Sequence, residues 1–238
     1  MTNQHTKVRI KFSKHSSMIF IGHLDIMRYF QKAMRRADID IAYSAGFNPH
    51  QIMSCAAPLG VGLYSNGEYL DIEMNAPMNS RLMMERLNQV MVEGVDILSV
   101  KKLPETAGNA MASVAAAGYL VAFRKGHEPS FDYEKKLPEF FLKEQILVVK
   151  KTKKSEKELD LKPYIYELSI RDGQIYMLVD ASSSGNIKPA LVMEAFYKEN
   201  GQVPSEFDFI ITREDTYTNL GTTEEPEFVP LDAVGSEM

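Results

Sequence analysis

The chain has 238 residues, of which 45% are apolar and 25% charged, and its 27 Lys and Arg against 32 Asp and Glu give a formal net charge of −5. This composition supports a folded core and excludes a mostly disordered chain, a collagen-like chain and a small disulfide scaffold. The single cysteine, Cys55, excludes an internal disulfide and a thiolate-bound metal site built from this chain alone, and no apolar stretch approaches the ~20 residues that span a bilayer. We therefore expect a cytoplasmic protein that holds no cofactor or metal in this chain and contacts no membrane.

Hydrophobic periodicity in the first half of the chain predicts a β-α-β-β-α-β order. Strands are indicated where apolar and polar residues alternate, and helices where apolar residues recur every three or four positions. The expected elements are a strand at 8–12, a helix at 22–37, strands at 39–41 and 67–74, a helix at 81–91 and a strand at 95–100. Asn79 or Ser80 can cap the second helix.

The second half repeats this order. The expected elements are a strand at 118–123, a helix at 131–144, strands at 146–149, 164–170 and 174–179, a helix at 189–198 and a strand at 207–212. Asp172-Gly173 favours a tight hairpin turn between two of the strands. We predict an α+β fold of two tandem ferredoxin-like (βαββαβ) units with antiparallel sheets. The N-terminal domain spans residues 1–104, a linker 105–117 and the C-terminal domain 118–213.

Residues 214–238 contain seven acids and no Lys or Arg, so this segment alone has a charge of −7. The first fifty residues have a charge of +5. The acidic segment shows little periodicity, so it is expected to be a disordered tail that keeps the protein soluble. The alternative is a segment that mimics nucleic acid and folds back on a basic face.

The helix expected at 22–37 has one apolar and one basic side. The apolar side consists of Leu24, Met27, Phe30, Met34 and Ala37. The basic side, at spacings i, i+4, i+7 and i+8, consists of Arg28, Lys32, Arg35 and Arg36. Each Lys or Arg can replace a counterion at a phosphate, so these four residues are candidates for RNA binding. The alternative is an ordinary solvated helix face.

The segment 43–50 is rich in turn-forming residues. Gly46 permits positive φ and Asn48-Pro49 favours a turn, so Phe47 can be displayed at a loop tip and stack on an unpaired base. Asn48 could read a base edge, and His50 could contact a phosphate. The alternative is an ordinary turn in which Phe47 is buried.

Three residues suggest catalysis. His23, Tyr43 and His50 could cleave RNA without metal, through attack by the 2′-hydroxyl, if they meet across a scissile phosphate. The alternative for His23 is a structural role, in which it orients the start of the helix together with Asp25.

Six segments together resemble the bacterial "radical SAM-linked" family, which has no established function. They are 9–14 (RIKFSK), 21–28 (IGHLDIMR), 33–37 (AMRRA), 43–50 (YSAGFNPH), 58–62 (PLGVG) and 67–72 (GEYLDI). Segment 158–164 (ELDLKPY) is similar to a further motif of that family. The resemblance implies a gene beside, or fused to, that of an uncharacterised radical SAM protein, in a setting linked to translation. The initial strand and helix also look like those of ferredoxin-like CRISPR RNA-processing proteins.

The resemblance also limits the role of this chain. A radical SAM enzyme binds its cluster through three cysteines, and this chain has one. The leading hypothesis is therefore a non-catalytic accessory protein that binds tRNA or rRNA and cooperates with a radical SAM partner. One alternative is an interaction module that docks the partner without RNA, through the loop 43–50 and the turn 65–68. The other is a metal-independent ribonuclease.

Overall fold

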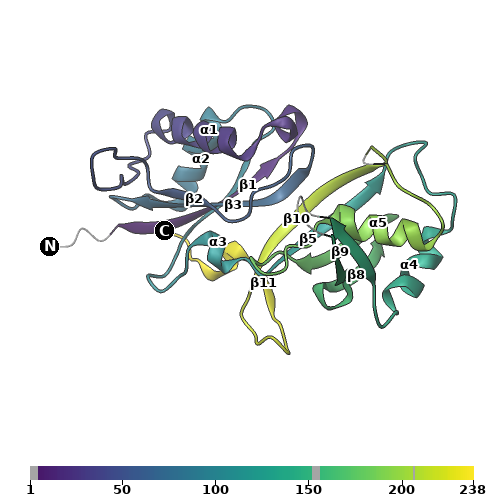
Figure 1. The fold of residues 1–238 in the computed structure, drawn as a ribbon. Helices are drawn as coiled ribbons and strands as arrows, with labels where there is room; N and C mark the ends of the chain where they lie inside the picture. The colour runs from purple at the N-terminus through teal and green to yellow at the C-terminus, as the bar shows by residue number, and fades with distance from the viewer. Residues whose placement is uncertain (1–4, 152–155, 206) are drawn as a thin grey trace. The chain divides into compact units, whose positions relative to one another are not determined.

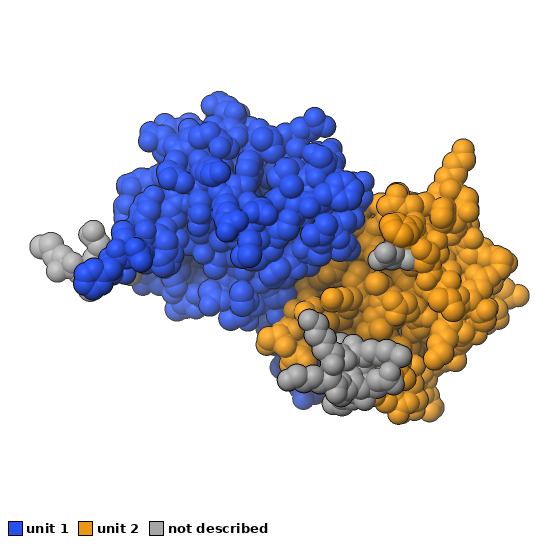
Figure 2. Space-filling model, turned by 45° about the horizontal axis from the view of Figure 1, so that its top comes forward, with its two compact units in different colours: residues 1–115, 213–238 blue, residues 116–212 orange. Residues whose placement is uncertain are grey.

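The computed structural model describes residues 5–151, 156–205 and 207–238. The chain divides into two compact units, each drawn in its own colour in Figure 2. Unit 1 contains Met1–Ala115 and Arg213–Met238, and unit 2 contains Ala116–Thr212. No helix within the described ranges has both the length and the apolar content needed to cross a bilayer.

Unit 1 begins with a sheet covered by two helices on one side (Figure 1). Its elements are β1 (Thr6–Lys14), η1 (Ser16–Phe20), α1 (His23–Arg36), β2 (Met53–Cys55), β3 (Tyr64–Met74), α2 (Ser80–Val90), β4 (Ile97–Lys102) and α3 (Ala110–Ser113). β1 pairs antiparallel with both β3 and β4, and β2 pairs antiparallel with β3. The strand expected at 39–41 is reduced to a single bridge between Ile41 and Met74.

The alternation along β1 gives this sheet two different faces. Val8, Ile10 and Phe12 are buried in the core beneath α1 and α2. Successive strand residues point to opposite faces, so Arg9 and Lys11 lie on the other face. Their antiparallel partners on β3 are Asp71 and Tyr69, so the second face is polar where the first is apolar.

The helices of unit 1 lie where the sequence predicted them, but the buried side of α1 differs in part from the predicted apolar side. Asn79 caps α2, and its side chain accepts hydrogen bonds from the backbone N–H groups of Arg81 and Leu82. On α1 the buried residues are Ile26, Phe30, Ala33 and Met34. Leu24, expected on the apolar side, is 70% exposed, because the buried side is centred on the line through Ile26 and Phe30.

Unit 2 has its own hydrophobic core between strands and the helices α4 and α5. Its elements are β5 (Ala116–Phe123), α4 (Tyr133–Phe141), β6 (Leu147–Lys151), β7 (Glu156–Asp160), η2 (Lys162–Tyr164), β8 (Ile165–Arg171), β9 (Gln174–Asp180) and α5 (Pro189–Glu199). The turn between β8 and β9 is as predicted, since both Asp172 and Gly173 have positive φ. β6 and β7 pair only with each other in a separate two-stranded sheet.

The acidic segment 214–238 is ordered, contrary to the expectation of a disordered tail. It contains the second half of β10 (Phe209–Asn219), then β11 (Phe228–Pro230) and the short helix η3 (Leu231–Val234). β11 pairs antiparallel with the end of β10, and η3 packs on β1 and β4. Leu231 is fully buried. Local periodicity could not predict this order, because it depends on contacts with residues about 130 to 220 positions earlier in the chain.

The predicted fold class is wrong. Instead of two tandem ferredoxin-like units with separate antiparallel sheets, the strands form one nine-stranded sheet in the order β4-β1-β3-β10-β5-β9-β8, with β2 on β3 and β11 on β10. The physical reason is the length of β10, which runs seven residues beyond the strand expected at 207–212 and pairs with β3, β5 and β11. The unit boundaries also differ from the expected domains, since unit 1 includes residues 105–115 of the expected linker and the C-terminal segment.

Candidate nucleic-acid interface

The outward side of α1 carries the four predicted basic residues, and all four are exposed. We call Arg28, Lys32, Arg35 and Arg36 the α1 basic face. Arg28 is paired with Asp25 at 3.0 Å, one turn earlier on the same helix. Arg36 donates a hydrogen bond to the carbonyl oxygen of Val90 at 3.1 Å, and its guanidinium lies 5.7 Å from the centre of the Tyr29 ring.

The middle of this face carries charge that no carboxylate of the described residues neutralises. Within the described parts of the chain, neither Lys32 nor Arg35 forms an ion pair, and Arg35 bonds only to the backbone oxygen of Gln31, at 3.3 Å. The exposed Leu24 lies one turn before Arg28 on the same side of the helix. The α1 basic face is therefore a positive surface, open to solvent, with an apolar residue at its first turn.

The loop 43–50, which we call the Phe47 loop, is closed at its base and open at its tip. Tyr43 and Gln51 form a bridge, and the Ser44 hydroxyl contacts His50 Nδ1 at 2.8 Å and accepts from the His50 backbone N–H at 3.1 Å. Gly46 has a φ of 113°, a conformation that favours glycine. The Phe47 side chain is fully exposed. The structure thus displays Phe47 at the tip, and the alternative in which it is buried does not hold.

The predicted catalytic residues do not come together. Tyr43 and His50 lie in the Phe47 loop, just after the point where Ile41 bridges Met74 at the end of β3 (Figure 1). His23 lies beside Glu68, six residues earlier on β3, which is ~20 Å along a strand. His50 is held by Ser44, and the Tyr43 hydroxyl accepts from Gln51 at 3.4 Å. His23 on one side, and Tyr43 with His50 on the other, therefore lie at different positions along β3.

His23 instead lines a small recess at the start of α1, which we call the Lys14 recess. Its volume is about 20 Å³, and its polar walls are Lys14, His23, Cys55 and Glu68, with apolar walls from Phe12, Ile26, Ala57, Pro58 and Leu59. Burial raises the pKa of the Cys55 thiol to about 12, and the nearby carboxylates of Glu68 and Asp71 act in the same direction. The thiol is therefore neutral and no nucleophile at physiological pH.

Sequence reasoning missed Lys14, although a signal was present. Val8, Ile10 and Phe12 alternate into the core, and Lys14 continues the same parity, where an apolar residue is expected. The structure buries Lys14 to 3% exposure. A lysine at a core position of a strand needs a structural or functional reason.

The segment 65–68, expected to be a turn, is instead part of β3. Three of its residues, Ser65, Gly67 and Glu68, are buried.

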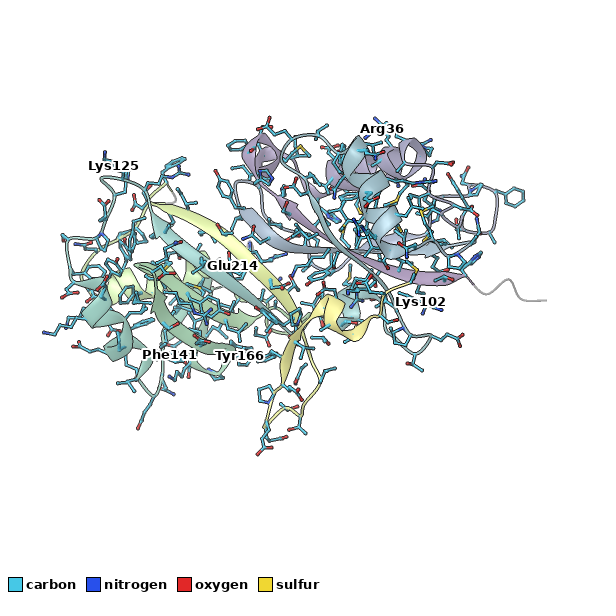
Figure 3. The ribbon with its side chains drawn as sticks, turned by 180° about the vertical axis from the view of Figure 1, so that it is seen from behind. Arg36, Lys102, Lys125, Phe141, Tyr166 and Glu214 are labelled. Atoms are coloured by element: carbon cyan, nitrogen blue, oxygen red, sulfur yellow. The ribbon has the colours of Figure 1, made fainter. Side chains whose placement is uncertain are left out.

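The second face of the unit 1 sheet has basic residues too, and the C-terminal segment covers them. Arg9 makes two parallel bonds to Asp71, at 2.7 and 2.8 Å, and a third to the carbonyl oxygen of Leu231 at 2.8 Å. Lys11 bonds to Asp215 at 2.6 Å, and Lys101 pairs with Glu237. In Figure 3 Arg36 lies on the helix side of this unit, and Lys102 lies beside the C-terminal segment, where its backbone bonds to Ser236.

The Tyr69 hydroxyl connects two carboxylates of that segment. It lies 2.6 Å from Asp215 and 3.1 Å from Asp232, and Asp232 also accepts from the Ser99 hydroxyl at 2.6 Å. Burial and both carboxylates raise the pKa of Tyr69, which keeps its proton available as the hydrogen-bond donor. This network attaches the acidic segment to the sheet.

The segment 158–164 of unit 2, which is similar to a motif of the family named above, makes contacts that hold the structure together. Asp160 accepts hydrogen bonds from the backbone N–H groups of Ile146 and Lys162, at 2.8 and 3.0 Å. The Lys162 ammonium donates to the carbonyl oxygen of Phe141, at the end of α4, and lies 3.8 Å from the centre of the Phe141 ring. These contacts hold η2 against α4.

Among the described residues of both units, no three His, Cys, Asp or Glu side chains lie close enough together to bind a metal ion.

Comparison with known protein families gives a match. A family model described as "Uncharacterized protein conserved in bacteria (DUF2344)" matches residues 7–189. This range includes all the segments that carry the resemblance stated above, but the description says nothing of radical SAM enzymes. That link therefore stays a prediction. No curated protein matches the chain.

Proposed function

Since the chain belongs to the bacterial DUF2344 family, which brings no activity with it, we propose from its own geometry that unit 1 binds RNA through the α1 basic face and the Phe47 loop. The observation that carries the proposal is the full exposure of Phe47 in a loop that begins seven residues after the basic end of α1. An exposed aromatic ring offers a flat face on which an unpaired base can stack.

The two parts of the surface have different tasks in this proposal. Lys32 and Arg35 contact phosphates, because their charges are not neutralised by carboxylates in the described chain. Phe47 stacks on a base in a single-stranded loop or bulge, and Asn48 and His50 lie beside it to contact the same nucleotide. Structured RNA with unpaired nucleotides, such as tRNA or rRNA, supplies both kinds of contact.

The proposal extends to a role beside a radical SAM enzyme. The single Cys55 has a neutral, largely buried thiol, which gives the chain no means to bind an iron–sulfur cluster itself. We therefore propose that radical chemistry, where it occurs, belongs to a separate protein or domain, and that this chain presents the RNA to it.

The test replaces exposed residues only, so folding is preserved. Fluorescence anisotropy would measure the affinity for a labelled tRNA and for a matched duplex without loops. We expect Phe47→Ala to weaken tRNA binding about 10-fold, the scale of one lost base–aromatic stack. The matched control is Phe207→Ala, which removes an exposed phenyl ring from unit 2 and should leave the affinity unchanged.

A protein partner is the second candidate, because an exposed Phe47 can also enter an apolar pocket of another protein. The two candidates separate in nuclease-treated lysate. If Phe47→Ala abolishes co-purification of a radical SAM protein while tRNA affinity stays at the wild-type value, the loop is a protein-docking element and the RNA proposal fails.

A further inference from the structure

A pocket of about 170 Å³ lies on the second face of the unit 1 sheet, and we call it the Glu73 pocket. In the strand register Glu73 is opposite Lys7, and Asp71 is opposite Ser54, so these four side chains lie on the same face. All four line the pocket, and Asn109, the cap of α3, forms a further polar wall. Every wall of the pocket belongs to unit 1.

The two carboxylates of the pocket differ in what they bind. Asp71 accepts two hydrogen bonds from Arg9, one at each oxygen, at 2.7 and 2.8 Å. The Glu73 carboxylate accepts no hydrogen bond and forms no ion pair within the described chain. Its cross-strand neighbour Lys7 bonds instead to the carbonyl oxygen of Ala107, at 3.4 Å. Glu73 is therefore the open acceptor of this pocket.

The other polar walls can donate hydrogen bonds. The Lys7 ammonium has three N–H donors, and its one bond in the described chain is long. The Asn109 side chain uses its oxygen to accept from the Ala112 N–H at 2.8 Å, which leaves its NH₂ group available. The Ser54 hydroxyl has no hydrogen bond to a described residue. The pocket thus presents one free carboxylate with donors around it.

The size of the pocket favours a flat ring. A cavity of about 150 Å³ holds one benzene ring, whereas drug-sized ligands take about 300 Å³ or more. Ile52 and Leu103 give the pocket apolar surface against which such a ring can pack. A nucleobase is a ring of this kind, with hydrogen-bonding groups on its edges.

The pocket also adjoins the base of the Phe47 loop. The Glu73 carbonyl oxygen accepts from the Ala42 N–H at 2.7 Å, and the Glu73 N–H donates to the Ile52 carbonyl oxygen at 3.2 Å. Ala42 and Ile52 flank the loop, and Ile52 is itself a wall of the pocket. Phe47 is five residues from Ile52, at most ~18 Å, so a few nucleotides of RNA can reach both.

We infer that the Glu73 pocket binds a guanine base of the RNA that is held at the Phe47 loop. The Watson–Crick edge of guanine has two adjacent donors, N1–H and the 2-amino group, and the acceptor O6 beside them. The two oxygens of the Glu73 carboxylate accept these donors side by side, and Lys7 donates to O6. Adenine, cytosine and uracil have no such adjacent pair of donors. This inference rests on the proposed function and adds a base preference to it.

The 2-amino group gives the sharpest test, because inosine lacks it and otherwise matches guanosine. The full chain would be titrated with guanosine monophosphate and with inosine monophosphate, followed by backbone amide NMR shifts. The amides of Ser54, Glu73 and Gly108 should move and saturate, with about 10-fold weaker affinity for the inosine nucleotide, the scale of one bidentate pair. Equal affinities, or no saturating shift at these amides, would overturn the guanine site.

The key variant is Glu73→Gln, which keeps the size of the side chain and removes the second acceptor oxygen. It should abolish the preference for the guanosine nucleotide and leave the melting temperature unchanged, because Glu73 has no ion pair in the described chain to lose. A structural role for Glu73 predicts the reverse, a lower melting temperature with the preference retained. The matched control is Glu93→Gln, which removes an exposed carboxylate outside the pocket and should keep the preference.

A second variant fills the pocket. Ser54→Leu breaks no side-chain hydrogen bond to a described residue and places a larger apolar group among the walls. It should abolish the response to guanosine monophosphate while the chain stays folded. A folded Ser54→Leu that binds the nucleotide like the wild type would show that the ligand lies elsewhere.

The RNA arm separates this inference from the proposed function. In fluorescence anisotropy, a short uridine oligomer with one guanosine should bind about 10-fold tighter than the same oligomer with one inosine, and Glu73→Gln should bind both equally. If tRNA affinity depends on Phe47 and the α1 basic face but the wild type binds both oligomers equally, the proposed function stands and this inference fails. If guanosine monophosphate fills the pocket while Phe47→Ala and the double variant Lys32→Ala with Arg35→Ala keep full tRNA affinity, the pocket takes a free nucleotide. The proposed function then fails, and so does the RNA assignment of the pocket.

Discussion

On the helix side of unit 1, Lys32 and Arg35 extend into solvent. On the other side of the same sheet, Arg9 is buried and Lys11 half-buried, and each is paired with a carboxylate. Both pairs of residues are basic in the sequence. The difference comes from Asp71 of β3, which pairs with Arg9, and from the C-terminal segment, which brings Asp215, Asp232 and Glu237 to the second face. Basic residues therefore indicate a polyanion site only where the fold leaves them without carboxylate partners.

This comparison also bears on the acidic segment itself. It folds back on basic residues, which is the geometry that the second interpretation of the segment required. The contacts are specific and partly buried, such as the three hydrogen bonds of Arg9 and the two carboxylates at Tyr69. They make the segment part of the fold. Whether it also mimics nucleic acid stays a prediction.

The largest expected effect comes from breaking the covered face. Arg9→Met leaves Asp71 without its cation and the Leu231 carbonyl without its donor, in a place where Arg9 is fully buried. We expect the free energy of unfolding to fall by about 3–5 kcal/mol. Arg28→Met breaks the exposed pair with Asp25 and should cost less than about 1 kcal/mol. Urea unfolding of both variants measures the difference, and equal losses would refute the contrast between the faces.

A smaller effect is expected from overpacking where β3 meets the C-terminal segment. A Cβ atom on Gly67 would lie 2.5 Å from the Cα atom of Asp215, so the backbone of β10 must move. Gly67→Ala should cost about 1–3 kcal/mol. Gly108→Ala is the matched control, because its nearest atom, the Ser113 hydroxyl oxygen, is 3.5 Å away and its φ is not positive. Thermal unfolding distinguishes them, and a silent Gly67→Ala would mean that β10 does not lie against Gly67.

The smallest effect concerns the end of the acidic segment. The hydrogen bond from Lys101 holds the pKa of Glu237 below its usual value, so the charged carboxylate is favoured in the folded state. The resulting stability is present above the unfolded pKa near 4.3 and is lost as pH falls through the lower folded pKa. Because Glu237 is largely exposed, Glu237→Gln should lower the melting temperature at pH 7 by about 1–3 °C.

The control for that prediction is pH itself. As pH falls through the lowered pKa of Glu237, the carboxylate of the wild type becomes protonated, so the difference in melting temperature between wild type and Glu237→Gln should disappear. A difference that persists at pH 3 would show that the variant acts through packing and not through the pair with Lys101.

Local features of the sequence predicted the elements that depend on local physics. The helix α1, the cap at Asn79 and the turn at Asp172 and Gly173 each follow from a few adjacent residues, and all are present. The exposure of Phe47 was one of two alternatives that the sequence left open, and the structure decides between them.

The features that were missed depend on long-range contacts. The order of residues 214–238 comes from partners such as Lys11 and Tyr69, and no local pattern encodes those pairs. The single nine-stranded sheet follows from the same cause, because β10 is extended by pairing and not by its own alternation. Leu24 was predicted to lie on the buried side of α1 and is exposed. Apolar spacing alone allows several neighbouring sides of a helix to face the core, and tertiary packing decides which one does.

The most direct test of the central claim compares the salt dependence of tRNA binding for two double variants that lose equal charge. Lys32→Ala with Arg35→Ala alters the α1 basic face, and Lys101→Ala with Lys102→Ala alters the edge beside the C-terminal segment. The account predicts that the first reduces the slope of log K against log salt by ~1.4, as expected for two single-strand phosphate contacts, and that the second leaves it unchanged. Equal reductions in both variants, or none in the first, would contradict it.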